Sequence, residues 1–139
     1  MILKFKKLHP DAIVPTYGTE HAAAFDLYAL EAVTAQWGRA VVKTGLAFEI
    51  PKGCAMFIKP RSGLAFNQGV EAFQGTIDSD YRGEVKVLLT TSDTEQDITV
   101  KKGDRIAQAI VIPVPKVSFE EVTELSNTLR GAQGFGHTG

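Results

Sequence analysis

GTIDSDYRGEVKV, residues Gly75 to Val87, places three acidic side chains, a tyrosine and an arginine between two short apolar runs. Thr76-Ile77 is typical of a strand end, and the alternation of Glu84 to Leu89 predicts a second strand. The segment therefore predicts a hairpin with its turn at Asp80 to Gly83 and with Asp78 beside that turn. Taken alone, a turn rich in Asp and Gly is ordinary hairpin chemistry.

Working outward from this segment, the chain consists of short apolar runs separated by Gly, Pro and Asx turns. One short helix is predicted at Arg61 to Asn67, and Ala40 to Ile50 forms one or two strands with Gly45 as a possible bulge. This pattern predicts an all-β sandwich or barrel. The strands are expected at Ile2–Leu8, Ala22–Leu30, Ala40–Ile50, Cys54–Lys59, Val85–Thr90, Ile98–Val100, Arg105–Ile112 and Val117–Val122.

Composition limits the classes of function. A chain of 139 residues with 44% hydrophobic and 22% charged residues is expected to form one globular domain. Its net charge of -1 offers no general attraction to nucleic acid or to an anionic membrane. Cys54 is the single cysteine, so we expect it in the core rather than in a disulfide. Without a membrane-length apolar run or a secretory signal, a cytoplasmic (intracellular) protein is expected.

Two segments before the central turn carry candidate site residues. Asp26 lies within the apolar stretch Ala23 to Leu27, where it could bind a metal or a phosphate or could simply be solvated. Arg61-Ser62-Gly63 follows a proline at a predicted helix start, which offers amides and a guanidinium to an anion. The alternative is that Ser62 caps the helix beside a surface arginine.

Two segments after the central turn add further candidates. Asp104-Arg105 is expected to be a structural ion pair in a turn, and Gln108 is polar within an apolar strand and needs a buried partner. The glycine-rich residues 127–139 cannot bury enough surface to fold alone, so we expect a mobile C-terminal arm. The arm lacks the Gly-Lys-Ser/Thr of a Walker A loop, but its arginine, aromatic ring and hydroxyl could close over phosphates and a base.

Together and in this order, the segments resemble the motifs of the homotrimeric dUTPase family. The matching stretches are AAAFDLYA, PRSGLA, GTIDSDYRGEVKV, GDRIAQAIVIP and RGAQGFGHTG. The resemblance implies one domain over residues 1–139, with a distorted β-barrel or jelly-roll subunit, one short helix and a flexible arm. It also implies a homotrimer whose active sites lie at subunit interfaces, with the arm reaching over from another subunit. A strand that is apolar on both faces, Arg105 to Ile112, independently favours burial against another copy.

The resemblance further implies hydrolysis of dUTP to dUMP and pyrophosphate, which keeps uracil out of DNA and supplies dUMP for thymidylate synthesis. Asp78 would activate the attacking water, Tyr81 would pack under the deoxyribose, and Asp26 would hold a water of the Mg²⁺ shell. The remaining substrate contacts would be Arg61, Ser62, Gly63 and Gln108 on the phosphates, Gly75, Thr76, Ile77 and the backbone near Lys86 on uracil, and Arg130, Phe135, Gly136, His137 and Thr138 from the arm.

Two other readings stay open. Ala24 stands where the family usually has glycine, His137 stands where serine is common, and Ala65 to Gln74 is shorter than usual. The related dCTP deaminases share the fold, but they lack the Asp-Tyr-Arg-Gly turn and this fifth segment. A non-catalytic nucleotide-binding trimer would require the loss of a catalytic group, whereas Asp78 is present.

Overall fold

The structure is a computed structural model that describes residues 1–136. Strands dominate it, as the all-β prediction requires, and one short helix interrupts them. In chain order the elements are β1 (Lys4–Lys7), β2 (Thr16–Tyr17), β3 (Phe25–Tyr28), β4 (Val33–Ala35), β5 (Arg39–Lys43), β6 (Leu46–Glu49), β7 (Cys54–Lys59), α1 (Ser62–Gln68), β8 (Val70–Ala72), β9 (Thr76–Ile77), β10 (Lys86–Thr91), β11 (Ile98–Val100) and β12 (Arg105–Pro113).

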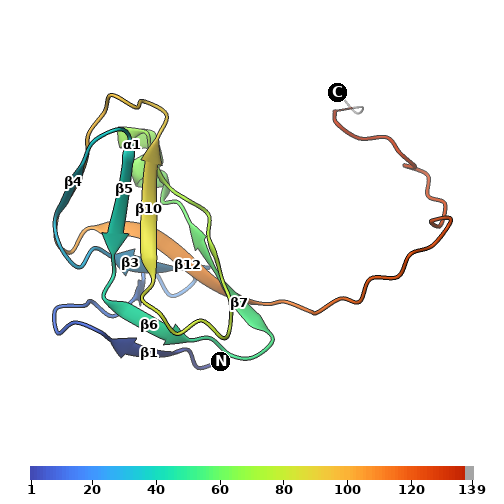
Figure 1. Cartoon of the computed structure of the whole chain (residues 1–139), viewed down its shortest axis with the longest axis horizontal. Coiled ribbons are helices and arrows are strands. Elements are labelled where there is room, and N and C mark those ends of the chain that lie inside the picture. The colour runs from blue at the N-terminus through green and yellow to red at the C-terminus, as the bar shows by residue number, and fades with distance from the viewer. Residues whose placement is uncertain (137–139) are drawn as a thin grey trace.

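The strands of the described chain form four sheets. The largest has the order β2-β3-β12-β7-β9, a second has the order β5-β10-β8, and two pairs are β1-β6 and β11-β4. All the pairings are antiparallel. Figure 1 shows β5 and β10 side by side in front of β3 and β12, with β1 and β6 below them. The hydrogen bonding of these residues forms separate sheets and no closed barrel.

The inward faces of these sheets meet in one apolar core. Burial alternates along β5, where Ala40 and Val42 point inward, because successive side chains of a strand point to opposite faces. Cys54 is buried in the same core and is a free thiol, as predicted. On β12, Ile106 and Ala107 are buried, whereas Ile112 near its end is exposed. Only some of the apolar side chains of β12 are therefore buried within one chain.

Gly45 separates two strands that belong to different sheets, so it is not a bulge within one strand. Its φ is +69°, in the left-handed region that favours glycine. A Cβ at this position would lie 3.0 Å from the Cβ of Ala12 and 3.1 Å from Cδ1 of Leu30. Both the backbone conformation and the close packing therefore require glycine here.

The predicted hairpin around the central turn is wrong. β9 pairs with β7, with Met56 opposite Ile77, whereas β10 pairs with β5 and β8. The segment between β9 and β10 thus crosses from the five-stranded sheet to the three-stranded sheet. The sequence correctly predicted a strand on each side of the turn, but such local patterns carry no information about which strand each one joins.

The segment after β12 also departs from the expectation. The strand predicted at Val117 to Val122 is wrong, since residues 114–136 contain no strand. Figure 1 shows this segment leaving the body of the molecule and running away from it. Phe119 is 96% exposed, so within one chain its ring packs against nothing. A strand needs a neighbour for its backbone groups, and the described chain offers none here.

The helix prediction is confirmed to within one residue at each end. Arg61, with extended backbone angles, occupies the N-cap position and makes no side-chain capping hydrogen bond. Ser62 is the first residue inside the helix, so the hypothesis that Ser62 caps it is wrong. Gly69, with φ +63°, ends the helix, and its N–H donates to the carbonyl of Ala65.

Within residues 1–136 no helix has the length and apolar character needed to span a bilayer. The cytoplasmic location expected from the sequence stays a prediction.

The described fold predicts one strong polar contributor to stability. Thr44 is 1% exposed, and its hydroxyl donates to the carbonyl of Val85 at 2.6 Å. We expect Thr44→Val to lower the free energy of unfolding by about 1–3 kcal/mol, because an acceptor is left buried without its donor. Urea unfolding at a fixed protein concentration measures the change. Thr99→Val, on an exposed position of β11, is the matched control and should change stability by less than about 0.5 kcal/mol. Equal effects of the two substitutions would contradict the prediction.

Candidate active site

The first group of candidate residues meets in a small polar pocket of about 210 Å³. β3 supplies Asp26, and β12 supplies Gln108, which lies directly opposite Asp26 in the strand register. The start of α1 adds Arg61 and Ser62. The full lining is Gly18, Ala22, Ala24, Asp26, Arg61, Ser62, Arg105 and Gln108. Ala24, one of the departures noted in the sequence, is part of this wall.

Two arginines share the carboxylate of Asp26. Nε of Arg61 donates to Oδ1 at 3.1 Å, and Nη1 of Arg105 lies 3.7 Å from Oδ2. Nη1 of Arg61 also donates to the carbonyl of Arg105 at 3.4 Å. The Asp26 side chain is only 13% exposed, which reduces solvent screening of these pairs. Two guanidinium groups against one carboxylate leave an excess positive charge, and guanidinium is well suited to bind phosphate.

The structure tests two predictions about this region, a hydrogen-bond partner for Gln108 and an ion pair between Asp104 and Arg105. Nε2 of Gln108 donates to the carbonyl of Pro60 at 2.8 Å, so Gln108 has a hydrogen-bond partner, which is part-buried rather than buried. The expected ion pair between Asp104 and Arg105 is wrong. Asp104 instead accepts a hydrogen bond from the backbone N–H of Lys101 at 2.9 Å, while Arg105 turns to Asp26. Adjacent residues at a strand start point in different directions, which explains the separation.

The second group lies in a different pocket, of about 320 Å³, at the crossing between β9 and β10. Asp78 follows the last residue of β9 and is exposed. Lys86 begins β10 on the other side of the pocket. The lining residues are Thr76, Ile77, Asp78, Tyr81, Glu84, Val85 and Lys86. Gly75 precedes this group, and its carbonyl accepts from the N–H of Ile58 at 2.9 Å, which ties the start of the segment to β7.

Hydrogen bonds define the turn that follows Asp78. The N–H of Tyr81 donates to the carbonyl of Asp78 at 3.2 Å. Nη1 of Arg82 donates to the carbonyls of Ser79 at 2.7 Å and of Tyr81 at 3.0 Å. The hydroxyl of Tyr81 donates to the carbonyl of Glu84 at 3.1 Å. These contacts hold the turn by local interactions instead of hairpin pairing.

The third group lies on the C-terminal segment, which runs away from the body of the molecule (Figure 1). Nε of Arg130 donates to the carbonyl of Gln133 at 2.9 Å, and the ring of Phe135 is fully exposed. Gly136 has a φ of +87°. The candidate residues His137 and Thr138 lie outside the described residues.

Within one chain the candidate residues therefore form three groups and not one site. The two pockets share no lining residue. Gly63, the remaining candidate, lies in the first turn of α1 beside Ser62. Sequence reasoning missed Arg105 as a member of the first pocket. The sequence signal was that Arg105 begins a predicted strand. The register that brings this strand beside the strand of Asp26 is known only from the structure.

Asp26 is the candidate contact for a metal ion. Residues 1–136 contain no cluster of three or more His, Cys, Asp or Glu side chains that could hold an ion. Mg²⁺ does not need such a cage when substrate phosphates and water supply most of its ligands, since one or two carboxylates then suffice. A single carboxylate at the edge of a phosphate-compatible pocket fits that mode of binding.

Known proteins resemble the whole chain. The dUTPase family model matches residues 10–139. A protein named deoxyuridine 5′-triphosphate nucleotidohydrolase from Nautilia profundicola is 52% identical, with coverage of 100% of this chain and 99% of the relative. A protein of the same name from Helicobacter hepaticus is 49% identical and covers 100% of this chain and 89% of the relative.

A solved dUTPase structure has a similar fold. It is a mutant dUTPase of Staphylococcus bacteriophage 80alpha with dUpNHpp, and it superposes with a TM-score of 0.90 at 25% identity. The match covers 99% of this chain and 98% of the phage protein. The all-β, jelly-roll-like fold agrees with these likenesses. The chain belongs to the dUTPase family.

Proposed function

We propose that this protein hydrolyses dUTP to dUMP and pyrophosphate. The observation that carries the proposal is Asp78, an exposed carboxylate in a pocket with Tyr81 and Lys86, in a chain that matches dUTP nucleotidohydrolases over its full length. The dCTP deaminase and non-catalytic readings are not favoured, because the relatives carry the nucleotidohydrolase name. Pyrophosphate release from dUTP, with no ammonia release from dCTP, is the direct test.

In the proposed mechanism, Asp78 orients a water molecule and accepts its proton. The water oxygen bonds to the α-phosphorus, and the bond from that phosphorus to the oxygen bridging to the β-phosphorus breaks. Pyrophosphate is the leaving group and dUMP the other product. Phosphoryl transfer depends mainly on positioning and charge stabilisation, so one carboxylate is sufficient as the base.

The phosphates are proposed to bind in the polar pocket of β3, α1 and β12. Arg61, Ser62 and Gly63 donate to the phosphate oxygens, and Gln108 contacts the α-phosphate region. The excess positive charge of the two arginines around Asp26 supports this assignment. Asp26 would hold Mg²⁺ through a water molecule, and the bound ion would neutralise part of the triphosphate charge.

The nucleoside is proposed to bind in the pocket of Asp78. The backbone of Gly75, Thr76 and Ile77, with the backbone near Lys86, reads the edge of uracil. The Tyr81 ring packs under the deoxyribose, where a 2′-hydroxyl would collide with it. The lining of the pocket supports this assignment, because Tyr81 supplies its aromatic ring.

The C-terminal arm is proposed to cover the bound nucleotide. Arg130 and residues Gly136, His137 and Thr138 contact the γ-phosphate, and Phe135 lies over the uracil ring. Closure over the substrate would exclude water from the reacting phosphate. The exposure of Phe135, a large apolar ring without a partner in the described chain, supports a role that begins when a ligand binds.

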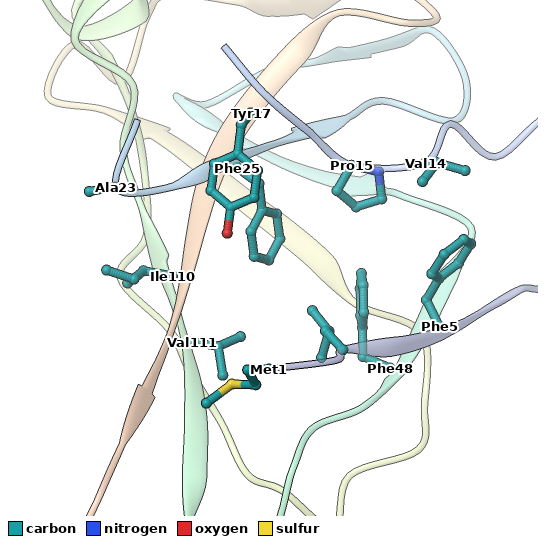
Figure 2. A pocket seen from close by; sticks show the side chains of 11 residues that line it. Met1, Phe5, Val14, Pro15, Tyr17, Ala23, Phe25, Phe48, Ile110 and Val111 are labelled. Carbon is teal, nitrogen blue, oxygen red and sulfur yellow. The ribbon is translucent and has the colours of Figure 1, made fainter. Parts of the chain in front are cut away.

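A homotrimer with active sites at subunit interfaces belongs to the same proposal. One support is the separation of the two candidate pockets within a single chain. Another is an apolar pocket of about 480 Å³, which Figure 2 shows between Phe5 and Phe48 on one side and Ile110 on the other. The exposed apolar residues of the segment between β12 and the arm, such as Val117 and Phe119, are suited to cover such a surface on another copy.

The first test concerns the base. Asp78→Asn should bind dUTP but turn it over at least about 100-fold more slowly, because the positioned base is lost. Turnover is measured as pyrophosphate release under saturating dUTP. Asp80→Asn, in the same turn but outside the proposed machinery, is the matched control and should keep normal turnover. Near-normal turnover of Asp78→Asn would remove this residue from the mechanism.

The second test concerns the arm. A chain ending after Leu129 should keep its thermal stability but lose most of its kcat/KM for dUTP, because the arm has few contacts in the unliganded protein. Phe135→Trp in a Trp37→Phe background should report closure as a fluorescence change when a non-hydrolysable dUTP analogue and Mg²⁺ are added. Full activity of the shortened chain would show that the arm is dispensable.

The third test concerns assembly. Sedimentation at micromolar concentration should give about three times the mass of one chain. Phe119→Ser should weaken the assembly by removing an exposed apolar ring from the segment after β12, whereas Lys116→Ser, a nearby exposed change, should not. A monomer mass for the unaltered protein would contradict the homotrimer.

A further inference from the structure

We propose that Gly83 is a specificity-determining residue, because the space left by its missing side chain fixes the position of the Tyr81 ring. This inference rests on the proposed function, since it assigns to Gly83 the control of sugar selection at the same site. Tyr81 and Asp78 line one pocket, so the position of the ring decides how much room lies beside the proposed base.

The space at Gly83 is already filled by the ring. A Cβ built on Gly83 would lie 2.3 Å from the hydroxyl oxygen of Tyr81, 2.6 Å from Cζ and 3.0 Å from Cε2. Carbon atoms in contact normally lie about 3.5–4.0 Å apart, so the ring and a Cβ cannot occupy these positions together. The φ of Gly83 is not in the left-handed region. Glycine is therefore required here for its small size and not for its backbone freedom.

The backbone around Gly83 is held by hydrogen bonds on both sides, most firmly on the C-terminal side, where the residues are buried or part-buried. Nη1 of Arg82 donates to the carbonyls of Ser79 and Tyr81 on the N-terminal side. On the C-terminal side, a carboxylate oxygen of Glu84 accepts from the N–H of Gly45 at 3.0 Å. The N–H of Val85 donates to the carbonyl of Leu46 at 2.8 Å. A methyl group at position 83 would therefore displace the Tyr81 ring and leave the turn in place.

The Tyr81 ring has room to move to a new position, because it is partly exposed to solvent. Tyr81 is 46% exposed, and its hydroxyl is held by one hydrogen bond to the carbonyl of Glu84. An exposed hydrogen bond of this kind contributes little to stability, because water replaces it. Gly83→Ala should therefore fold normally with a misplaced tyrosine. The effect of Gly83→Ala on stability can therefore be measured separately from its effect on sugar selection.

A first experiment follows the ring without using activity. The chain contains three tyrosines, so 3-fluorotyrosine labelling gives three ¹⁹F signals, and Tyr81→Phe assigns that of Tyr81. In Gly83→Ala the Tyr81 signal should shift while the signals of Tyr17 and Tyr28 stay in place. The urea midpoint should stay close to that of the unaltered protein. An unmoved Tyr81 signal in the folded variant would overturn the proposal.

A second experiment measures sugar selection as the ratio of kcat/KM for dUTP to kcat/KM for UTP. Gly83→Ala should lower this ratio about tenfold or more, the scale on which a shaped pocket discriminates small groups. Tyr81→Ala should lower it in the same way. The double variant should resemble Tyr81→Ala alone, because Gly83 acts only through the ring.

The outcomes separate this inference from the proposed function. Additive effects of the two substitutions on the ratio, or an unchanged ratio in Gly83→Ala, would overturn the role of Gly83 while dUTP hydrolysis stood. Absence of pyrophosphate release by the unaltered protein would remove the proposed function itself. The ¹⁹F measurement would then still decide whether Gly83 positions the ring.

Discussion

The buried hydrogen bond between the Thr44 hydroxyl and the Val85 carbonyl ties the start of β10 to the link between β5 and β6. Between β9 and β10 the chain leaves the five-stranded sheet and enters the three-stranded sheet, and no pairing between these two strands guides the crossing. Thr44 instead donates to Val85 at 2.6 Å and accepts from the N–H of Leu46 at 3.2 Å. Val85 donates in turn to the Leu46 carbonyl. Since buried backbone groups must be satisfied, these bonds fix where β10 begins and where the turn after Asp78 lies.

Charge balance organises the other pocket. Asp26 is nearly buried, and an isolated carboxylate there would be costly. Arg61 and Arg105 supply opposite charge, and the strand register of β3 and β12 brings the two sides together. The excess of one positive charge then remains directed at the pocket. The same ion pairs that make burial of Asp26 tolerable thus also leave the pocket suited to an anion.

Sequence patterns predicted the positions of strands well, but they predicted poorly which strands and which side chains pair with one another. Cys54–Lys59 and Ile98–Val100 were predicted to the residue, because apolar alternation and flanking turns are local properties. The partner of β9 could not be predicted in this way, because it is chosen by packing far along the chain. Val117 to Val122 has the composition of a strand but no neighbour within the described chain. Arg105 illustrates the same limit in the site, since its partner is Asp26 and not the adjacent Asp104.

The division of the candidate site has a chemical consequence. In the pocket of Asp78, that carboxylate forms no ion pair with any of residues 1–136, and Lys86 is the one cationic residue in the lining. The pocket of Asp26 contains two arginines, and its one carboxylate is already engaged by both of them. Phosphoryl transfer to water requires a free base and concentrated positive charge at the same phosphate. Neither pocket meets both requirements, and the two share no lining residue. This division is consistent with the proposed homotrimer, in which the Asp78 pocket of one copy faces the Asp26 pocket of another.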